Sequence, residues 1–153
     1  MPVTGPLAHI DISVGYPDRS IPFYAAFLEA LGDRRRTVRS AEWQEPNPSR
    51  ATWGIQYSSG ARFDVEVRPA RPARRDRRFD RYEPGPHHLA LHAQSRAVVE
   101  RVYAAMLELG ATRLDPPADY SDRPGYDDGY FAVFFADPDG LKLEVAHIPR
   151  ANP

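Results

Sequence analysis

Two histidines and two glutamates stand at matching places in the sequence, each beside a short apolar stretch: His9, His88, Glu66 and Glu144. Imidazole nitrogens and carboxylate oxygens together suit a borderline divalent ion such as zinc, nickel, cobalt, manganese or ferrous iron. Calcium prefers more oxygen ligands, and copper(I) prefers sulfur. We therefore interpret all four residues as candidate metal ligands, and Glu66 and Glu144 also as candidate catalytic groups that move a proton.

The matching places come from an internal repeat. A shift of 79 residues, the distance from His9 to His88, places residues 9–12 on residues 88–91. After the deletion of one residue, a shift of 78 places Val-Glu-Val at 65–67 on Leu-Glu-Val at 143–145. Order and spacing agree over the whole unit, which indicates two copies of one unit.

Each copy is expected to fold as strand, helix, strand, strand, strand, because apolar residues alternate in some segments and recur at helical spacing in others. The expected strands cover residues 7–14, 36–44, 50–57, 61–68, 86–93, 111–114, 130–136 and 141–148. We predict an α+β fold of two repeated βαβββ modules that form a cupped mixed β-sheet. The predicted parts of the single domain 1–153 are module 7–68, linker 69–85 and module 86–149.

Local signals set the expected helix ends. Asp18 or Ser20 is the expected cap of the first helix, with Pro22 in its first turn and Gly32 at its end. Ser95 is the expected cap of the second helix. The stretch 115–128 is rich in proline, aspartate and tyrosine, and we predict a polar loop there.

Strand alternation decides which side chains accompany the candidate ligands. In the first strand Ile10, Ile12 and Val14 share one face, which leaves His9, Asp11 and Ser13 on the other. In the last strand of the same copy, Glu66 shares its face with Asp64 and Arg68. If the two copies pack about a twofold axis, all four candidate ligands converge on the non-core face. We expect Asp11 and Arg68 beside them.

Each of these residues also has a plainer interpretation. A lone strand histidine is usually packed or solvated, and Glu66 beside Asp64 and Arg68 also fits a wet strand face. Alternation predicts that His87 faces the core. His92 shares the face of His88 and is a candidate proton relay.

Tyr120 and Tyr126 lie in the predicted polar loop, and Tyr130 lies just after it. They could line the mouth of a pocket, and simple packing within the loop explains them equally well.

The overall composition narrows the class of protein. The chain has 153 residues, 42% hydrophobic and 27% charged, a net charge of −1 and no cysteine. These values favour a folded, cytoplasmic protein and give no electrostatic reason to expect nucleic acid or a membrane as partner. No apolar run approaches the ~20 residues of a membrane span. Six arginines between residues 71 and 81 could recognise an anion, but a solvated loop is the plainer interpretation.

The pattern resembles the vicinal oxygen chelate superfamily, which includes glyoxalase I, fosfomycin-resistance proteins, extradiol dioxygenases and bleomycin-resistance proteins. The resemblance spans nearly the whole chain. Its most specific pieces are His9, the helix start Asp18-Arg19-Ser20 with Phe23-Tyr24, His87-His88-Leu89-Ala90-Leu91, and Asp137-Pro138-Asp139-Gly140-Leu141-Lys142-Leu143-Glu144. The resemblance implies paired βαβββ modules around a divalent metal, with His9, His88 and Glu144 as ligands and Glu66 as a fourth.

The number of ligands decides the implied chemistry. Four protein ligands resemble glyoxalase I, a metal-dependent lyase or isomerase acting on a small thiol-conjugated substrate such as a glutathione hemithioacetal. Three ligands resemble the dioxygenases, but this chain has no histidine between His9 and His87 and has Phe134 where those enzymes have a tyrosine. A metal-free antibiotic-binding protein of the bleomycin-resistance type and a thiol transferase are the alternatives. The resemblance also makes a homodimer conceivable.

Overall fold

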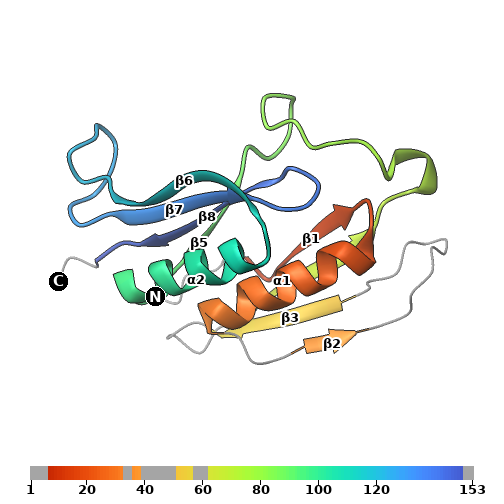
Figure 1. Ribbon diagram of the computed structural model, residues 1–153, viewed down its shortest axis with the longest axis horizontal. Coiled ribbons are helices and arrows are strands. Elements are labelled where there is room, and N and C mark those ends of the chain that lie inside the picture. Colours follow the sequence, from red (N-terminus) through yellow and green to blue (C-terminus); the bar gives the residue numbers. More distant parts are fainter. Residues whose placement is uncertain (1–6, 33–35, 39–50, 57–61, 150–153) are drawn as a thin grey trace. The chain divides into compact units, whose positions relative to one another are not determined.

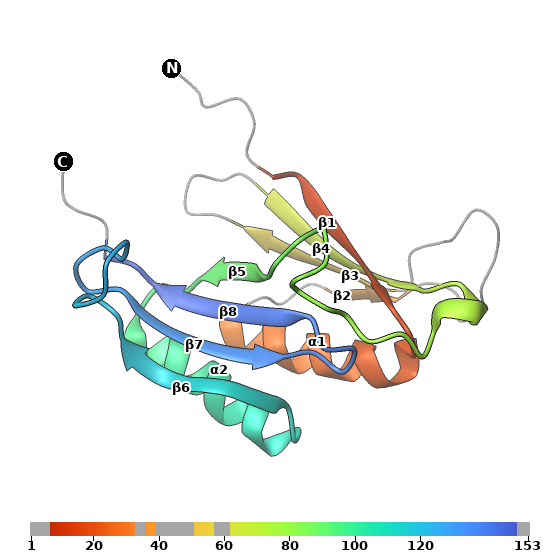
Figure 2. The same cartoon turned by 90° about the horizontal axis from the view of Figure 1, so that it is seen from above.

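Each half of the chain forms one mixed β-sheet with a helix packed on one of its faces (Figures 1 and 2). The computed structural model describes residues 7–32, 36–38, 51–56 and 62–149. The chain divides into two compact units, residues 1–77 and residues 78–153. Neither described helix is long and apolar enough to cross a membrane.

The first unit contains a four-stranded sheet in the order β1-β4-β3-β2. Strands β1 and β4 are parallel, and the other neighbours are antiparallel. The elements are β1 (His9–Val14), α1 (Pro17–Leu31), β2 (Arg36–Val38), β3 (Ala51–Gln56), β4 (Arg62–Pro69) and the 3₁₀ turn η1 (Pro72–Arg74).

The second unit repeats this arrangement, in the order β5-β8-β7-β6, again with one parallel pair. Its elements are β5 (Leu89–His92), α2 (Arg96–Glu108), β6 (Thr112–Asp119), β7 (Phe131–Ala136) and β8 (Lys142–His147). Asp11 lies opposite Glu66 in the first unit, and Ala90 lies opposite Glu144 in the second. The predicted α+β fold with repeated βαβββ modules is confirmed.

Apolar side chains fill the space between helix and sheet in each unit. In the first, Tyr24 and Leu28 of α1 are buried with Trp53 and Val65 of the sheet, and the rings of Tyr24 and Trp53 lie 6.3 Å apart. In the second, the buried face of α2 meets the buried residues of β7 and β8: Val99, Val102, Met106, Val133, Phe135, Leu143 and Val145. Strand alternation therefore turns Glu66 and Glu144 toward the opposite face of each sheet.

The structure corrects the predicted start of the first helix. Tyr16 is the N-cap and makes no side-chain capping bond, Asp18 lies in the first turn, and Pro22 lies inside the helix. Pro17 in the first turn starts the helix instead, because its fixed φ and missing N–H suit that place. Gly32 ends the helix with φ +118°, as predicted, and Ser95 caps α2 by accepting from the amide of Val98.

The structure also corrects the predicted polar loop at 115–128. Strand β6 continues to Asp119, through Pro116 and Pro117. An edge strand tolerates proline, and the register between β6 and β7 is irregular on both sides of Asp115. Residues 39–44, predicted as part of a strand, lie outside the described residues.

The Arg- and Pro-rich stretch divides between the units. Tyr16 donates to Asp76 (2.5 Å), which holds the stretch's first part on the first unit. The amide of Phe79 donates to the backbone carbonyl of Asp139 (2.9 Å), and Arg78 donates to the carbonyl of Pro138 (3.5 Å), both within the second unit.

Candidate functional site

Glu144 is a buried carboxylate on the sheet face that points away from α2. Its neighbours Leu143 and Val145 are buried on the helix side, so alternation places Glu144 on the other side, where its side chain shares a face with Phe134 and Ala146. The residue is only 4% exposed. A carboxylate at this depth needs hydrogen-bond partners.

Both oxygens of Glu144 have a partner. The hydroxyl of Tyr130 donates to Oε1 (2.5 Å), and Nε2 of His88 lies 3.0 Å from Oε2. Burial, followed by the hydrogen bond to Glu144, raises the pKa of Tyr130 far above its ordinary value, so this hydroxyl stays protonated and acts as a donor. The sequence pointed to Tyr130 only as a residue near a pocket, and its bond to Glu144 spans 14 positions of the chain.

The two ring nitrogens of His88 have different partners, Glu144 and the adjacent His87. Nδ1 of His87 lies 2.8 Å from Nδ1 of His88, and the two rings meet edge to face at 5.0 Å. The prediction that His87 faces the core is wrong: the residue is exposed and precedes β5, so strand alternation does not apply to it. Desolvation and then the neighbouring His88 lower the pKa of His87.

Aromatic rings surround the Glu144 side of the sheet. The rings of Tyr120, Tyr126 and Tyr130 contact one another in all three pairs, with centroids 4.8 to 6.5 Å apart. The ring of Tyr120 also lies 5.7 Å from that of Phe134. The apolar cluster on this face comprises Tyr120, Ala132, Phe134 and Ala146, with Ala118, Tyr130 and Ile148 packed against it. Burial raises the pKa of Tyr120. The three tyrosines therefore pack against one another, which was one of the two interpretations.

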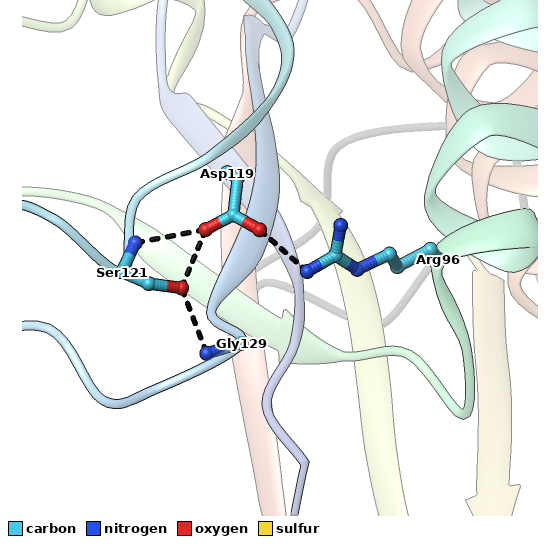
Figure 3. A network of polar contacts seen from close by, with 4 residues as sticks. All are labelled: Arg96, Asp119, Ser121 and Gly129. Atoms are coloured by element: carbon cyan, nitrogen blue, oxygen red, sulfur yellow. Dashed lines mark hydrogen bonds and ion pairs between the residues drawn. The ribbon is translucent and has the colours of Figure 1, made fainter.

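A polar network fixes the loop that carries Tyr130 (Figure 3). Asp119 accepts from the amide and hydroxyl of Ser121 and from Arg96 at the start of α2, and the Ser121 hydroxyl accepts from the amide of Gly129 (2.7 Å). The bonds from Ser121, then that from Arg96, lower the pKa of Asp119 to about 2. Sequence reasoning missed this network, although Asp-x-Ser at a strand end is a known turn signal.

In the first unit an arginine occupies the corresponding face. Nε of Arg68 lies 2.9 Å from Oδ2 of Asp11, and Nη2 lies 3.3 Å from Oε2 of Glu66. His9 is exposed and lies opposite Asp64 in the ladder. The second unit has no such ion pair at the equivalent places, because Ala90 stands for Asp11 and Ala146, two residues after Glu144, stands for Arg68.

Within the second unit, His88 thus lies with Glu144 and Tyr130, and within the first unit Asp11 and Glu66 lie with Arg68. Among the described residues, no three His, Cys, Asp or Glu side chains form a group that could hold a metal ion. His92, the suggested relay, has Nε2 3.3 Å from the carbonyl of Ile148. His147 has Nδ1 3.2 Å from the carbonyl of Ala93.

The His88–Glu144 pair fits a divalent ion by donor type and spacing. Nitrogen and oxygen ligands bind such ions at ~2.1 Å, which separates neighbouring ligands of an octahedron by about 3 Å. Nε2 and Oε2 are 3.0 Å apart. Glu66 fits less directly, since Arg68 already neutralises its carboxylate.

Comparison with known proteins adds independent information. The family model described as the Glyoxalase/Bleomycin resistance protein/Dioxygenase superfamily matches residues 7–145. The uncharacterised protein YqjT of Bacillus subtilis (strain 168) is 29% identical over 139 residues, which cover 90% of this chain and 94% of YqjT. The crystal structure of a candidate glyoxalase from Bacillus halodurans is 25% identical, with a TM-score of 0.68, and the match covers 95% of this chain and 97% of that one.

A second solved structure has the same fold. It is a glyoxylase/bleomycin resistance protein/dioxygenase domain from Frankia sp. EAN1pec, with a TM-score of 0.65 and 18% identity. The match covers 96% of this chain and all of that one (100%).

Proposed function

The chain belongs to the glyoxalase/bleomycin resistance protein/dioxygenase superfamily, and from this premise we propose that it is a divalent-metal-dependent enzyme of the glyoxalase type. The observation that carries the proposal is the 3.0 Å approach of His88 Nε2 to Oε2 of the buried Glu144. Burying a carboxylate between an imidazole and a phenol has a desolvation cost, and a bound cation would offset part of that cost.

The proposed ligands are His88 and Glu144 from the second unit, with His9 and Glu66 from the first. A bound divalent ion would supply Lewis-acid stabilisation of the negative charge that develops on substrate oxygens. Tyr130 keeps Oε1 of Glu144 hydrogen-bonded, so Oε2 is the oxygen turned toward His88. Glu66 would join the ligand set only by exchanging its contact with Arg68.

The proposed substrate is a small molecule with two neighbouring oxygens, such as the hemithioacetal of a 2-oxoaldehyde and a thiol. In its isomerisation to a 2-hydroxy thioester, a proton leaves the carbon that bears sulfur and returns to the neighbouring carbon. A carboxylate at the reaction centre can carry this proton. We assign the role first to Glu144 and then to Glu66, because Glu66 is already paired with Arg68.

Metal content and activity test the proposal together. We expect the purified protein, loaded with zinc, nickel, cobalt or manganese and then desalted, to retain about one ion per chain and to convert a glutathione hemithioacetal to its thioester, followed by ultraviolet absorbance. The Glu144→Ala variant should lose both properties. Glu108→Ala is the matched control, since Glu108 is an exposed helix residue. Failure of the parent protein to retain any of these ions would end the proposal.

A metal-free ligand-binding protein is the second candidate function. The exposed ring of Tyr126, which packs on Tyr130 beside Glu144, favours it, because an exposed aromatic ring can stack on a flat, apolar ligand. Calorimetry of the chelator-treated protein with an aromatic antibiotic distinguishes the two functions. Binding that is unchanged by chelation and by Glu144→Ala would support this second candidate.

A further inference from the structure

His87 contacts the one ring nitrogen of His88 that Glu144 does not occupy. Nδ1 of His88 faces Nδ1 of His87 at 2.8 Å, and Nε2 of His88 faces Glu144 at 3.0 Å. The pair of imidazoles, the carboxylate and the Tyr130 hydroxyl therefore form one continuous chain of contacts.

The proton positions in this chain follow from simple counting. A neutral imidazole carries one N–H, so each nitrogen-to-nitrogen contact needs one donor and one acceptor. A carboxylate oxygen accepts a hydrogen bond, so without a cation the Nε2–H of a neutral His88 donates to Oε2 of Glu144. Nδ1 of His88 must then accept, and the Nδ1–H of His87 must donate.

Binding a cation at Nε2 of His88 reverses this arrangement. The ligand atom must offer a lone pair, so His88 has to carry its proton on Nδ1. Nδ1 of His87 is the acceptor in reach of that proton, and His87 then carries its own proton on Nε2. A ligating histidine commonly donates its other N–H to a fixed partner, which sets its tautomer and ring orientation.

We propose that His87 is a positioning residue that accepts the Nδ1–H of His88 and presents Nε2 of His88 to a divalent cation. This role rests on the proposed function, because it needs a cation at His88. The ring of His87 also contacts the ring of Tyr82, edge to face with centroids 5.8 Å apart.

Two substitutions distinguish the hydrogen bond that His87 accepts from the space that its side chain fills. His87→Leu keeps a side chain of similar size without an acceptor, whereas His87→Gln retains an amide oxygen that can accept. Zinc affinity is measured for the full chain by competition with a chromophoric chelator. We expect His87→Leu to bind zinc about 10–100-fold more weakly than the parent, with at least partial recovery in His87→Gln. His147→Leu is the control and should bind as the parent does.

A spectroscopic readout tests the tautomer directly. Long-range ¹H–¹⁵N spectra at about pH 8, where an ordinary imidazole is neutral, should show His88 as the Nε2–H tautomer without zinc and the Nδ1–H tautomer with zinc. Zinc binding that is equally tight in the parent and in His87→Leu would overturn the role of His87 alone. A parent protein that retains none of zinc, nickel, cobalt and manganese would overturn the proposed function instead, and the metal-free spectrum would still test the proton positions.

Discussion

The hydroxyl of Tyr130 satisfies one oxygen of a carboxylate that is almost fully buried. Removing this donor leaves Oε1 of Glu144 without its hydrogen bond while the ring and its packing remain. We expect Tyr130→Phe to lower the free energy of unfolding of the metal-free protein by about 1–3 kcal/mol, measured by urea denaturation.

Tyr126→Phe is the control for this prediction. It removes a hydroxyl from the same aromatic group, and within the described part of the chain that hydroxyl has no hydrogen bond. Equal stabilities of the two variants would contradict the importance of the Tyr130 bond.

The sequence predicted the residues of this site better than their contacts. Glu144 could be found from its apolar flanks, since they imply a partner for the carboxylate. The 2.8 Å contact between His87 and His88 could not, because His87 precedes the strand and its direction depends on loop geometry. Glu66 looked equivalent to Glu144 in the repeat, and the difference lies in Arg68, which pairs with Glu66.

Among the elements, the turn after β6 depends on the ionised form of Asp119. The pKa of Asp119 is about 2 in the folded chain, below the ordinary value near 3.9, so its ionisation favours folding. This contribution is complete above about pH 4 and disappears as the pH falls toward about 2. We expect Asp119→Asn to be less stable than the parent near pH 6, and the difference to shrink toward pH 2.

Denaturant unfolding across this pH range measures the difference. Asp122→Asn is the control, because Asp122 is exposed in the same turn and has no partner among the described residues. A stability difference for Asp119→Asn that is independent of pH would refute the assignment.

The end of the same turn needs glycine for two reasons. Gly129 has φ +76°, and a Cβ there would lie 2.6 Å from Cγ of Pro149. Gly125, with φ +88°, has nothing within 4 Å of such a Cβ. Both Gly→Ala changes should cost the ~1–2 kcal/mol of a left-handed backbone.

Gly129→Ala should therefore cost about 1–3 kcal/mol more than Gly125→Ala, because it also forces Pro149 to move. Thermal and urea unfolding of the two variants gives the difference. Equal losses of stability in the two variants would show that Pro149 moves aside without a cost in free energy.

Secondary structure was predictable where the pattern was local. The first and last strands of each copy and both helices follow from alternation and helical spacing, and Gly32 and Ser95 end or begin a helix as predicted. Strand β6 was missed in part, because two prolines argue against a strand unless its place at the sheet edge is known.

At the scale of the whole molecule, the proposed ligand set draws on both units. We expect His9→Ala, a change in the first unit, to weaken zinc binding at least about tenfold. Equilibrium dialysis with a zinc indicator measures it. Ser13→Ala, an exposed position on the same strand, is the control. Unchanged affinity in His9→Ala would confine the metal to the second unit.

The two halves surround equivalent carboxylates, Glu66 and Glu144, with different partners. In the first, an arginine of the protein itself supplies the positive charge beside Glu66, and an outside cation has little to gain there. In the second, alanine stands in place of that arginine, and the partners of Glu144 are Tyr130 and His88. After a gene duplication, the loss or gain of this single arginine would leave one module with its own counterion. The carboxylate of the other module would then be available to an external cation.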